Sequence, residues 1–329
     1  MSHTFEDIIN INSLLLAWRE FLRGKQSKKD VQKFQFHLMD SILALNYDLS
    51  NGLYCHGGYE EFNISDPKPR IIHKATVRDR LLHHAVYRVL YRFFNTKFIS
   101  DSFSCRNNKG THGAVQRFKT FSNIVSKNNT KTCWVLKCDI KKFFASINQI
   151  VLMDILHGHI KDKKIIELLK EIILSFNSGV PSIGLPLGNL TSQLFCNIYM
   201  NEFDQFVKHK LKVKHYIRFA DDFVIFSESK GYLENLIPKI AEFLKVRLSL
   251  TLHPDKVFIK TLSSGVDFLG WNNFPRHTIL RTKTKQRMLK KLRGSREPET
   301  FASYLGLLQH GKTIKIKEKI LKMYDKVID

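Results

Sequence analysis

Apolar and polar positions alternate most clearly in the segment 216–226. There, two runs rich in aromatic and β-branched residues flank an adjacent acidic pair, Asp221 and Asp222. Two short strand-like runs on either side of turn-forming residues predict a hairpin with the acidic pair at its tip. An isolated Asp-Asp is usually a solvated turn, because aspartate is a favoured turn residue. The strand-like runs on both sides favour a functional site over a plain turn.

A second alternating run, 134–140, places another carboxylate at the end of a strand. With a period of two, Val135, Lys137 and Asp139 share one face, and the residues between them share the other. Asp139 is therefore expected level with the tip of the hairpin. Burying carboxylates together is costly unless cations bind them, and Mg²⁺ prefers carboxylate oxygens. The pattern predicts a site for two Mg²⁺ ions that support an in-line phosphoryl displacement.

Elsewhere, apolar residues recur mainly at helical spacing. Between these stretches, 52–69 is rich in Gly, Tyr and Pro and predicts loop and strand, and 68–74 predicts a basic strand. The helical spacing predicts helices within 1–24, 31–49, 79–94, 284–292, 298–309 and 316–328.

The charge of the chain adds a polyanionic partner to this picture. The 329 residues include 53 Lys and Arg against 30 Asp and Glu, a formal net charge of +23. Such an excess costs self-repulsion, and phosphates that neutralise it add affinity through counterion release. Nucleic acid is therefore the expected partner. A peripheral membrane role is disfavoured, because no apolar run of 18 residues, signal peptide or lipidation motif occurs.

Cysteine and histidine add no further site. The five cysteines are odd in number, scattered and without a Cys-x-x-Cys spacing, so neither a disulfide framework nor a zinc site is indicated. A reducing cytoplasm fits this usage best. No pair of the 14 histidines has the spacing of metal ligands, and His83 and His84 are expected to face apart on a helix.

Short motifs in a fixed order resemble those of reverse transcriptases. The stretch 219–222 (Phe-Ala-Asp-Asp) resembles the catalytic box of that family, and 139–144 (Asp-Ile-Lys-Lys-Phe-Phe) resembles its first metal-binding motif. Further boxes follow in the family's order, so the resemblance covers nearly the whole chain. It implies a right-hand polymerase of the α+β class, with an antiparallel palm sheet packed on helices. The expected subdomains are N-terminal helices and fingers over 1–130, palm over 131–274 and a basic helical thumb over 275–329.

The resemblance also implies roles at the metal site. Asp139 and Asp221 are expected to bind both Mg²⁺ ions, with Mn²⁺ as a substitute, and Ile140 is expected to add its backbone carbonyl. Asp222 would assist metal binding or shape the local field. Lys256 lies where the family has a lysine proposed to protonate the leaving pyrophosphate. A surface lysine that contacts backbone phosphate explains Lys256 almost as well.

Nucleotide-binding residues are implied in further segments. Arg70 and Lys74 share a strand face in the segment that resembles the triphosphate-gripping finger. Phe144 lies where the family places an aromatic ring that leaves no room for a 2′-hydroxyl. The alternative is that Phe143 and Phe144 both belong to the core, and at most one of them is expected to face the nucleotide.

The box 184–193 resembles the family's template and nucleotide loop. Gly188 is expected to let the backbone approach the nucleotide, and Asn189, Thr191 and Ser192 are expected to open or cap the next helix. Most relatives have Gln-Gly and end in Ser-Pro, whereas this chain has Leu187 before Gly188 and ends in Ser-Gln193. That departure resembles reverse transcriptases of diversity-generating retroelements, which copy a template RNA with frequent errors at adenines. Leu187 lacks the side-chain hydrogen bonds of a glutamine, so weaker control of the base pair is expected.

Two C-terminal segments are expected to hold the primer and the duplex. The segment 266–271 resembles the primer grip, a tight hairpin that would use Phe268, Leu269 and Gly270. From residue 276 onward the chain has 15 Lys and Arg against 5 acidic residues. The nucleic-acid contacts of this thumb are expected from Arg281, Lys283, Lys285, Arg287, Lys290 and Lys291.

The implied function is RNA-directed DNA polymerisation, error-prone at template adenines, in a diversity-generating retroelement. Its partners would be a template RNA, a primer strand or cDNA, dNTPs and a small basic accessory protein, without a membrane, in the cytoplasm. Two alternatives stay open: another reverse transcriptase, of the phage-defence or group II intron-like type, and a non-catalytic RNA-binding scaffold. The intact Asp139, Asp221 and Asp222 disfavour the scaffold.

Overall fold

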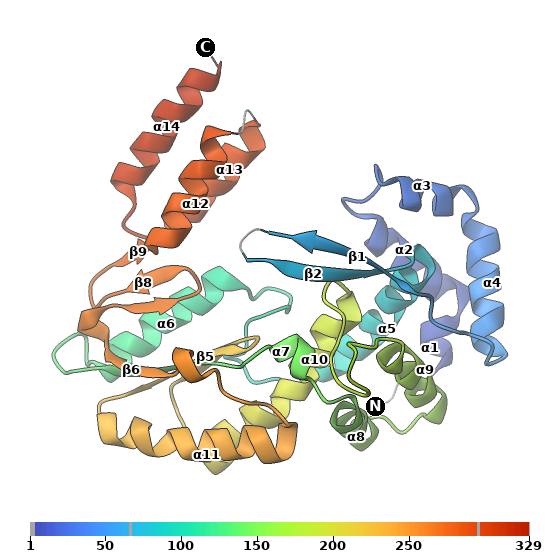
Figure 1. Cartoon of the computed structure of the whole chain (residues 1–329), viewed down its shortest axis with the longest axis horizontal. Helices are drawn as coiled ribbons and strands as arrows, with labels where there is room; N and C mark the ends of the chain where they lie inside the picture. The colour runs from blue at the N-terminus through green and yellow to red at the C-terminus, as the bar shows by residue number, and fades with distance from the viewer. Residues whose placement is uncertain (1–3, 66–67, 295–296, 329) are drawn as a thin grey trace. The chain divides into compact units, whose positions relative to one another are not determined.

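The computed structural model describes residues 4–65, 68–294 and 297–328, which combine α-helices with antiparallel sheets (Figure 1). The chain divides into two compact units whose segments alternate along the sequence. Unit 1 comprises Met1–Ser100, Ile140–Lys210 and Ala241–Leu252. Unit 2 comprises Asp101–Asp139, Leu211–Ile240 and His253–Asp329.

Unit 1 is mainly helical and carries a two-stranded antiparallel sheet, β1 (Tyr59–Ile64) and β2 (Arg70–Ala75). The helix α2 packs along α5, and Thr76 caps the start of α5 by accepting from the Asp79 amide. The helices are α1 (Glu6–Ile9), α2 (Ile11–Leu22), α3 (Lys29–Phe36), α4 (Leu38–Ser50), α5 (Val77–Asn95), α7 (Phe143–Ser146), α8 (Gln149–His159), α9 (Lys163–Leu174) and α10 (Leu190–Gln205), followed by the π-helical turn η1 (Phe206–Lys210).

The single helix predicted within 31–49 is in fact two helices, α3 and α4. The backbone leaves helical geometry at His37, with φ −111° and ψ 35°. The buried residues Val31, Ile42 and Leu45 have the spacing of residues on one face of a single continuous helix. Apolar spacing therefore could not reveal the break. The basic strand predicted at 68–74 and the helix predicted at 79–94 are confirmed as β2 and α5.

Unit 2 is built on a four-stranded antiparallel sheet in the order β4-β5-β3-β6. The helix α6 (Thr111–Val125) packs on this sheet, where the rings of Phe118 and Phe121 contact Phe226. The helix α11 (Lys230–Leu248) begins in unit 2 and ends in unit 1. The strands are β3 (Trp134–Asp139), β4 (Tyr216–Phe219), β5 (Asp222–Ser227) and β6 (Phe258–Thr261).

A second sheet and three C-terminal helices share another core of unit 2. The sheet has the order β7-β8-β9, with β7 (Val266–Phe268), β8 (Trp271–Asn273) and β9 (Thr278–Leu280). The helices are α12 (Thr282–Arg293), α13 (Pro298–Leu307) and α14 (Ile314–Ile328). Their common core buries Trp271, Leu280, Met288, Leu292, Phe301, Leu308 and Ile320. The three helices predicted in this region are confirmed.

Two further features concern the helices and the cysteines of the described residues. Among those residues, no helix is both long and apolar enough to cross a membrane. The five cysteines all lie in the described part of the chain, and they form no disulfide with one another.

Candidate active site

The predicted hairpin is formed by β4 and β5, and the acidic pair lies at its turn. Phe219 at the end of β4 pairs with Asp222 at the start of β5, so Ala220 and Asp221 make the two-residue connection. Ala220 has a left-handed backbone with φ 56°, a conformation typical of such short hairpin loops. The prediction of a hairpin with both aspartates at its tip is confirmed.

Asp139 ends β3 at the same edge of this sheet. In the antiparallel ladder, Asp139 pairs directly with Asp222. Residues directly opposite each other point to the same face with Cβ atoms about 5 Å apart, so the two carboxylates are neighbours. The expectation that Asp139 ends a strand level with the hairpin tip is confirmed. The next residue, Ile140, is buried and pairs with Leu252 in an isolated antiparallel bridge.

Two lysine ammonium groups lie against these carboxylates. Lys256 Nζ donates to Asp139 Oδ1 at 2.9 Å, and Lys137 Nζ lies 3.4 Å from Asp222 Oδ2. Lys256 ends the short 3₁₀ helix η2 (Pro254–Lys256) just before β6, whereas Lys137 belongs to β3. Each of these two carboxylates thus has a cationic neighbour, which is also the kind of neighbour that a bound metal ion would be.

The electrostatics of Asp222 indicate that a cation would be favoured here. Burial raises the pKa of Asp222 to about 7, and the Asp221 and Asp139 carboxylates add to the rise against the opposing effect of Lys137. Its Oδ1 atom is buried without a hydrogen-bond partner, which costs free energy that a coordinated cation would recover. Carboxylate oxygens suit Mg²⁺. Among the described residues, no three or more His, Cys, Asp or Glu side chains are grouped as a ready-made metal site.

Arg218 is a buried residue of this site that the sequence analysis did not single out. Its guanidinium donates to the Ala220 carbonyl at 3.1 Å and to the Ser102 hydroxyl at 3.1 Å, and its exposed fraction is 0%. These bonds hold the carbonyl that directly precedes Asp221 and so restrain the turn. The available signal was a permanently charged side chain inside a short apolar strand, because such a group is buried only when hydrogen-bonded.

Arg70 and Lys74, the residues expected to bind the triphosphate, both lie on β2 in unit 1. Arg70 is exposed. Lys74 Nζ lies 2.9 Å from Asp30 and 3.1 Å from Glu60. Its hydrogen bond to Asp30, and then that to Glu60, raises the pKa of Lys74. Lys74 is therefore charged and already paired, whereas Arg70 presents its guanidinium to solvent.

The loop before α10 is fastened to β2. The His73 amide donates to the Leu187 carbonyl at 2.9 Å, and the Asn189 side chain donates to the His73 carbonyl at 2.8 Å. Asn189 opens α10 as predicted, but it makes no side-chain capping bond, because its Oδ1 atom accepts from the Ala75 amide of β2 instead. Gly188 has φ 110°, and an added Cβ would lie 2.7 Å from Ile72 Cγ2. Glycine thus permits the close approach of this loop to β2.

The remaining nucleotide-site candidates of unit 1 differ in exposure. Phe143 is buried and Phe144 is half-buried, so only Phe144 offers ring surface to a ligand. The Leu185 amide donates to the Phe144 carbonyl at 2.9 Å, which joins α7 to the box 184–193. Gln193 lies half-buried in the first turn of α10.

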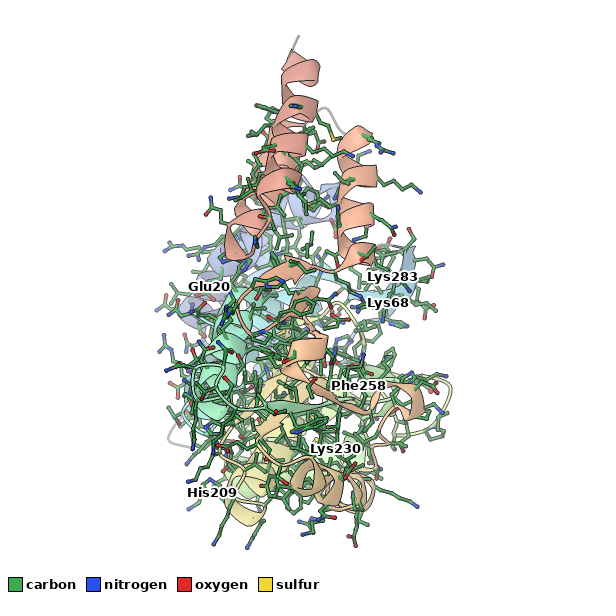
Figure 2. The ribbon with its side chains drawn as sticks, turned by 90° about the vertical axis from the view of Figure 1, so that its left-hand side faces the viewer. Glu20, Lys68, His209, Lys230, Phe258 and Lys283 are labelled. Carbon is green, nitrogen blue, oxygen red and sulfur yellow. The ribbon has the colours of Figure 1, made fainter. Side chains whose placement is uncertain are left out.

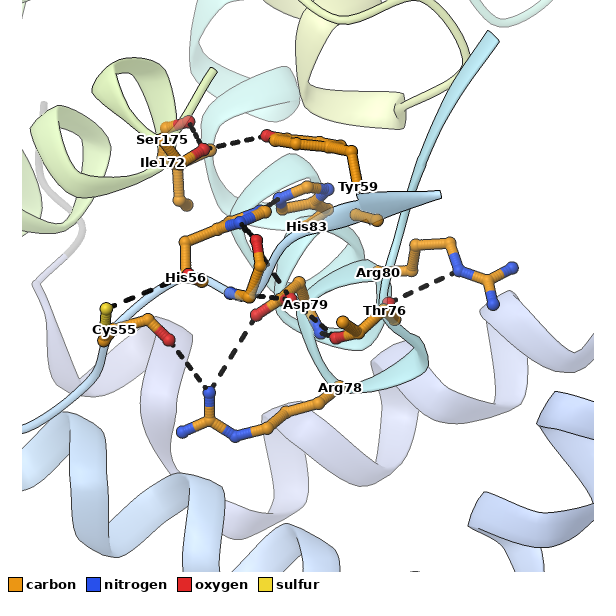
Figure 3. A network of polar contacts seen from close by, with 12 residues as sticks. Cys55, His56, Tyr59, Thr76, Arg78, Asp79, Arg80, His83, Ile172 and Ser175 are labelled. Carbon is orange, nitrogen blue, oxygen red and sulfur yellow. Dashed lines mark hydrogen bonds and ion pairs between the residues drawn. The ribbon is translucent and has the colours of Figure 1, made fainter. Parts of the chain in front are cut away.

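A buried polar network supports the junction between β2 and α5 (Figure 3). The fully buried Asp79 accepts hydrogen bonds from the Tyr54 hydroxyl at 2.8 Å and the Thr76 hydroxyl at 2.5 Å. The Nε2 atoms of His56 and His83 lie 3.2 Å apart, so one imidazole must accept from the other. Burial lowers the pKa of His83 well below its ordinary value. The buried His83 ring is therefore a neutral support of this network, and its pairing with His56 was not suggested by their separation in the sequence.

The hairpin predicted at 266–271 is formed by β7 and β8. Its turn consists of Leu269 and Gly270, which have φ 51° and 85°. Phe268 is fully buried, and its ring stacks on Phe118 of α6. Residue 268 could therefore contact nucleic acid only through its backbone, whereas the turn residues Leu269 and Gly270 are partly exposed.

The predicted basic residues of the C-terminal region lie on and just before α12. Met288 and Leu292 turn to the core, whereas the basic side chains are exposed. Figure 2 shows Lys283 near the start of this helix. Arg281 pairs with Asp267 of β7 at 2.9 Å. The exposed set is Arg281, Lys283, Lys285, Arg287, Lys290 and Lys291.

The site and the fold agree with the similarity of this chain to known proteins. Residues 65–273 match the protein family described as reverse transcriptase (RNA-dependent DNA polymerase). This chain belongs to that family. The predicted enzyme class, RNA-directed DNA polymerase, is the class of the family. The diversity-generating subtype and the individual site roles stay predictions.

The proteins similar in sequence to this chain include a group II intron-encoded protein. The chain is 23% identical over 284 residues to the group II intron-encoded protein LtrA of Lactococcus lactis, covering 65% of this chain and 46% of LtrA. It is 24% identical over 258 residues to protein YkfC of Escherichia coli, covering 67% and 66%. It is 21% identical over 279 residues to the putative COX1/OXI3 intron 2 protein of Saccharomyces cerevisiae, covering 66% and 30%. The chain thus spans less than two thirds of each of these relatives.

Solved telomerase structures share the fold. Apo telomerase from Candida tropicalis aligns with a TM-score of 0.55 at 16% identity, covering 83% of this chain and 57% of the telomerase chain. Telomerase from the same organism in complex with a fragment of telomeric RNA aligns with a TM-score of 0.52 at 15% identity, covering 89% and 57%. The predicted α+β polymerase fold class is confirmed. The assignment of 1–130, 131–274 and 275–329 to fingers, palm and thumb stays a prediction.

Proposed function

We propose that this chain is an RNA-directed DNA polymerase that copies an RNA template into DNA with two Mg²⁺ ions. The observation that carries the proposal is the antiparallel pairing of Asp139 with Asp222, beside Asp221 in the turn. The family is that of RNA-dependent DNA polymerases, and carboxylates gathered at one sheet edge are suited to a two-metal nucleotidyl transfer.

The metal ligands would come from Asp139, Asp221 and Asp222, which form the acidic edge of the unit 2 sheet, and from Ile140, which follows Asp139. Asp139 and Asp221 would hold both ions, with the carbonyl of Ile140 as a further ligand and Asp222 as a supporting carboxylate. When bound, the ions lower the pKa of the primer 3′-hydroxyl and neutralise charge on the triphosphate. The buried, unpartnered Oδ1 of Asp222 supports this assignment. Mn²⁺ accepts the same oxygen ligands and would act as a substitute.

Lys256 would act as the general acid for the leaving pyrophosphate. Its ammonium donates to Asp139 Oδ1 at 2.9 Å, which places a proton donor at the edge where the triphosphate would be bound. With Asp139 engaged in holding a metal ion, the Lys256 ammonium would be available to the pyrophosphate, because two cations compete for one carboxylate.

Residues of unit 1 would select and orient the nucleotide. Arg70 would engage the triphosphate in a bidentate manner, and Lys74 would exchange its carboxylate partners for a phosphate. The partly exposed ring of Phe144 would exclude a 2′-hydroxyl. The backbone at Leu187 and Gly188, together with Gln193 in the next helix, would line the template and nucleotide pair.

Residues of the C-terminal region would hold the primer strand and the duplex. The turn Leu269–Gly270 would contact the primer terminus, and Phe268 would contribute through its backbone, because its ring is buried. The exposed basic residues of α12 would neutralise phosphates of the template–primer duplex.

Primer extension on a generic RNA template with dNTPs and Mg²⁺ tests the polymerase proposal. The double variant Asp221→Ala/Asp222→Ala should make no product but bind RNA as wild type does, measured by fluorescence anisotropy. Asp255→Asn, an exposed aspartate next to Lys256, should extend normally. Extension by the double variant would refute the active-site assignment. A wild type that stays inactive with its own template RNA and accessory protein would indicate the non-catalytic scaffold.

We further propose that the enzyme is error-prone at template adenines and belongs to a diversity-generating retroelement. Leu187 carries this proposal, because the resemblance places it where most relatives have a glutamine, and leucine lacks the side-chain hydrogen bonds of glutamine. Sequencing of the cDNA should show errors concentrated opposite adenines, and Leu187→Gln should reduce them. Leu174→Gln, at an exposed position of α9, is the matched control. Accurate wild-type product would indicate a phage-defence or group II intron-like enzyme.

The partners that this proposal requires are a template RNA, a primer strand and a small basic accessory protein, acting with the enzyme in the cytoplasm. The net charge of +23 supports RNA and DNA as partners. Co-purification of a defined RNA with the chain, identified by sequencing, would name the template.

A further inference from the structure

Lys137 contacts two different elements at the acidic edge of unit 2. It lies on β3 two residues before Asp139, on the same face of the strand. Its Nζ atom lies 3.4 Å from Asp222 Oδ2 and donates to the backbone carbonyl of Asp267 at 2.9 Å. The side chain is 13% exposed, so water competes little with these contacts.

Asp267 belongs to β7, the first strand of the hairpin that carries the Leu269–Gly270 turn. Its carboxylate lies 2.9 Å from Nη1 of Arg281, which is the residue before α12. A continuous polar chain therefore runs from Asp222 through Lys137 and Asp267 to Arg281.

The contacts of Lys137 are suited to holding β7 in a fixed position beside β3. Its ammonium has three donors and bonds to a backbone carbonyl, so the contact follows the path of β7 rather than the identity of residue 267. A hydrogen bond from a charged group is stronger than a neutral one. By contrast, Lys256 has 40% of its side chain exposed and reaches Asp139 from outside the sheet ladder. The pair of Arg281 with Asp267 is 45% and 27% exposed, so it contributes less.

We propose that Lys137 is a positioning residue that fastens the β7–β8 hairpin to the catalytic carboxylates. The inference rests on the proposed function, in which Asp222 supports the metal site and the hairpin holds the primer terminus. Lys137 then sets the distance between the reacting hydroxyl and the carboxylate edge. It does so without touching either substrate.

Hydrogen exchange of the purified chain tests the link without any synthesis. In Lys137→Met, amides within 266–273 should exchange about tenfold faster, because the hairpin loses its bond to β3. In Lys260→Met, an exposed lysine of β6 that lies over the Phe258 ring, exchange should match wild type. Exchange over α6 should stay at the wild-type rate in both variants, which checks that unit 2 is folded. Equal exchange within 266–273 in the two variants would overturn the proposal.

Steady-state kinetics and metal binding give the second readout. For Lys137→Met, the KM for primer–template should rise about tenfold, equivalent to about 1.4 kcal/mol, while the KM for dNTP stays unchanged. Mn²⁺ binding, followed by electron paramagnetic resonance without substrates, should stay within about threefold of wild type. Loss of Mn²⁺ binding as large as in Asp222→Asn would overturn the proposal, because Lys137 would then be needed to form the metal site.

The two proposals fail in different ways. If wild type makes no DNA under any condition, the proposed function fails, and the exchange data still decide whether Lys137 holds the hairpin. If wild type makes DNA and the exchange of 266–273 is unaffected by Lys137→Met, only the role of Lys137 is wrong. Lys137→Arg keeps a cation and a donor at the site, and it should return the exchange rate to within about threefold of wild type.

Discussion

Near the acidic edge of unit 2, the strands carry two cationic side chains, the buried Arg218 and the half-buried Lys137. Each donates to a backbone carbonyl, Arg218 to that of Ala220 and Lys137 to that of Asp267. A buried charged group is tolerated only when its donors are satisfied. The geometry of the hairpin tip therefore depends on side chains that precede it in the strands, as well as on the turn residues themselves.

Replacing Arg218 should destabilise the fold more than replacing an exposed arginine. Arg218→Met removes two donors and leaves the Ala220 carbonyl and the Ser102 hydroxyl without them, so the free energy of unfolding should fall by about 3 kcal/mol. Urea unfolding followed by circular dichroism measures this change. Arg276→Met, at an exposed position, should change it by less than about 0.5 kcal/mol. Equal midpoints for the two variants would show that Arg218 does not support the turn.

At the scale of elements, β2 carries candidate site residues of unit 1 and also contacts two segments that support them. Its residues Arg70 and Lys74 are triphosphate candidates, its His73 backbone binds the loop at Leu187 and Asn189, and its end leads into the buried network under α5. The loop approaches β2 so closely that position 188 has no room for a side chain. The strand and the loop are thus expected to move together when a nucleotide binds.

Gly188→Ala should disturb the contact between this loop and β2. The added Cβ would lie 2.7 Å from Ile72 Cγ2, and alanine would have to adopt φ 110°. Such backbone strain costs about 1–3 kcal/mol, so thermal unfolding should begin at a lower temperature. Adding Ile72→Ala should restore only the part due to the clash.

The control for this prediction is a glycine without either constraint. At Gly231 in α11, an added Cβ meets nothing within 4 Å and φ is not positive. Gly231→Ala should leave the unfolding temperature unchanged or raise it slightly. A Gly188→Ala variant as stable as Gly231→Ala would contradict the close approach of the loop to β2.

At the scale of the whole molecule, the net charge of +23 predicts that the affinity for nucleic acid comes mainly from the neutralisation of phosphates. The exposed basic side chains of α12 concentrate part of that charge on one helix whose apolar residues Met288 and Leu292 are buried. A helix of this kind can present cations to a duplex while remaining anchored in its own core.

RNA affinity should therefore fall steeply with salt, and the slope should depend on α12. Each lost phosphate contact reduces the slope of log K against log salt by about 1, so Lys285→Gln/Lys290→Gln should flatten it by about 2. Fluorescence anisotropy at several salt concentrations gives the slope. Lys239→Gln, at an exposed position of α11, should change it less than either α12 substitution. A double variant with the wild-type slope would exclude α12 from the RNA contact.

Local pattern was sufficient to predict the elements that carry the acidic edge. The hairpin at 216–226, the strand ending at Asp139 and the three C-terminal helices all follow from periodicities of two or 3.6 residues, which depend only on neighbours in the sequence. The family resemblance followed from motif order in the same way. The sequence did not predict the break at His37, because the buried positions before and after it have the spacing of one continuous helix.

Contacts between distant segments were decided only by the tertiary structure. The approach of Lys137 to Asp267, of Arg218 to Ser102, of Asn189 to His73 and of His56 to His83 each joins residues that no short-range period relates. Asn189 illustrates this, since a local rule predicted a capping bond, whereas its side chain accepts from the Ala75 amide and donates to the His73 carbonyl of β2, far away in the sequence. Sequence alone thus determined which strands and helices form and which carboxylates they carry. Packing determined which cations and amides hold those carboxylates and loops in place, because burial forces each polar group to find a partner wherever the fold supplies one.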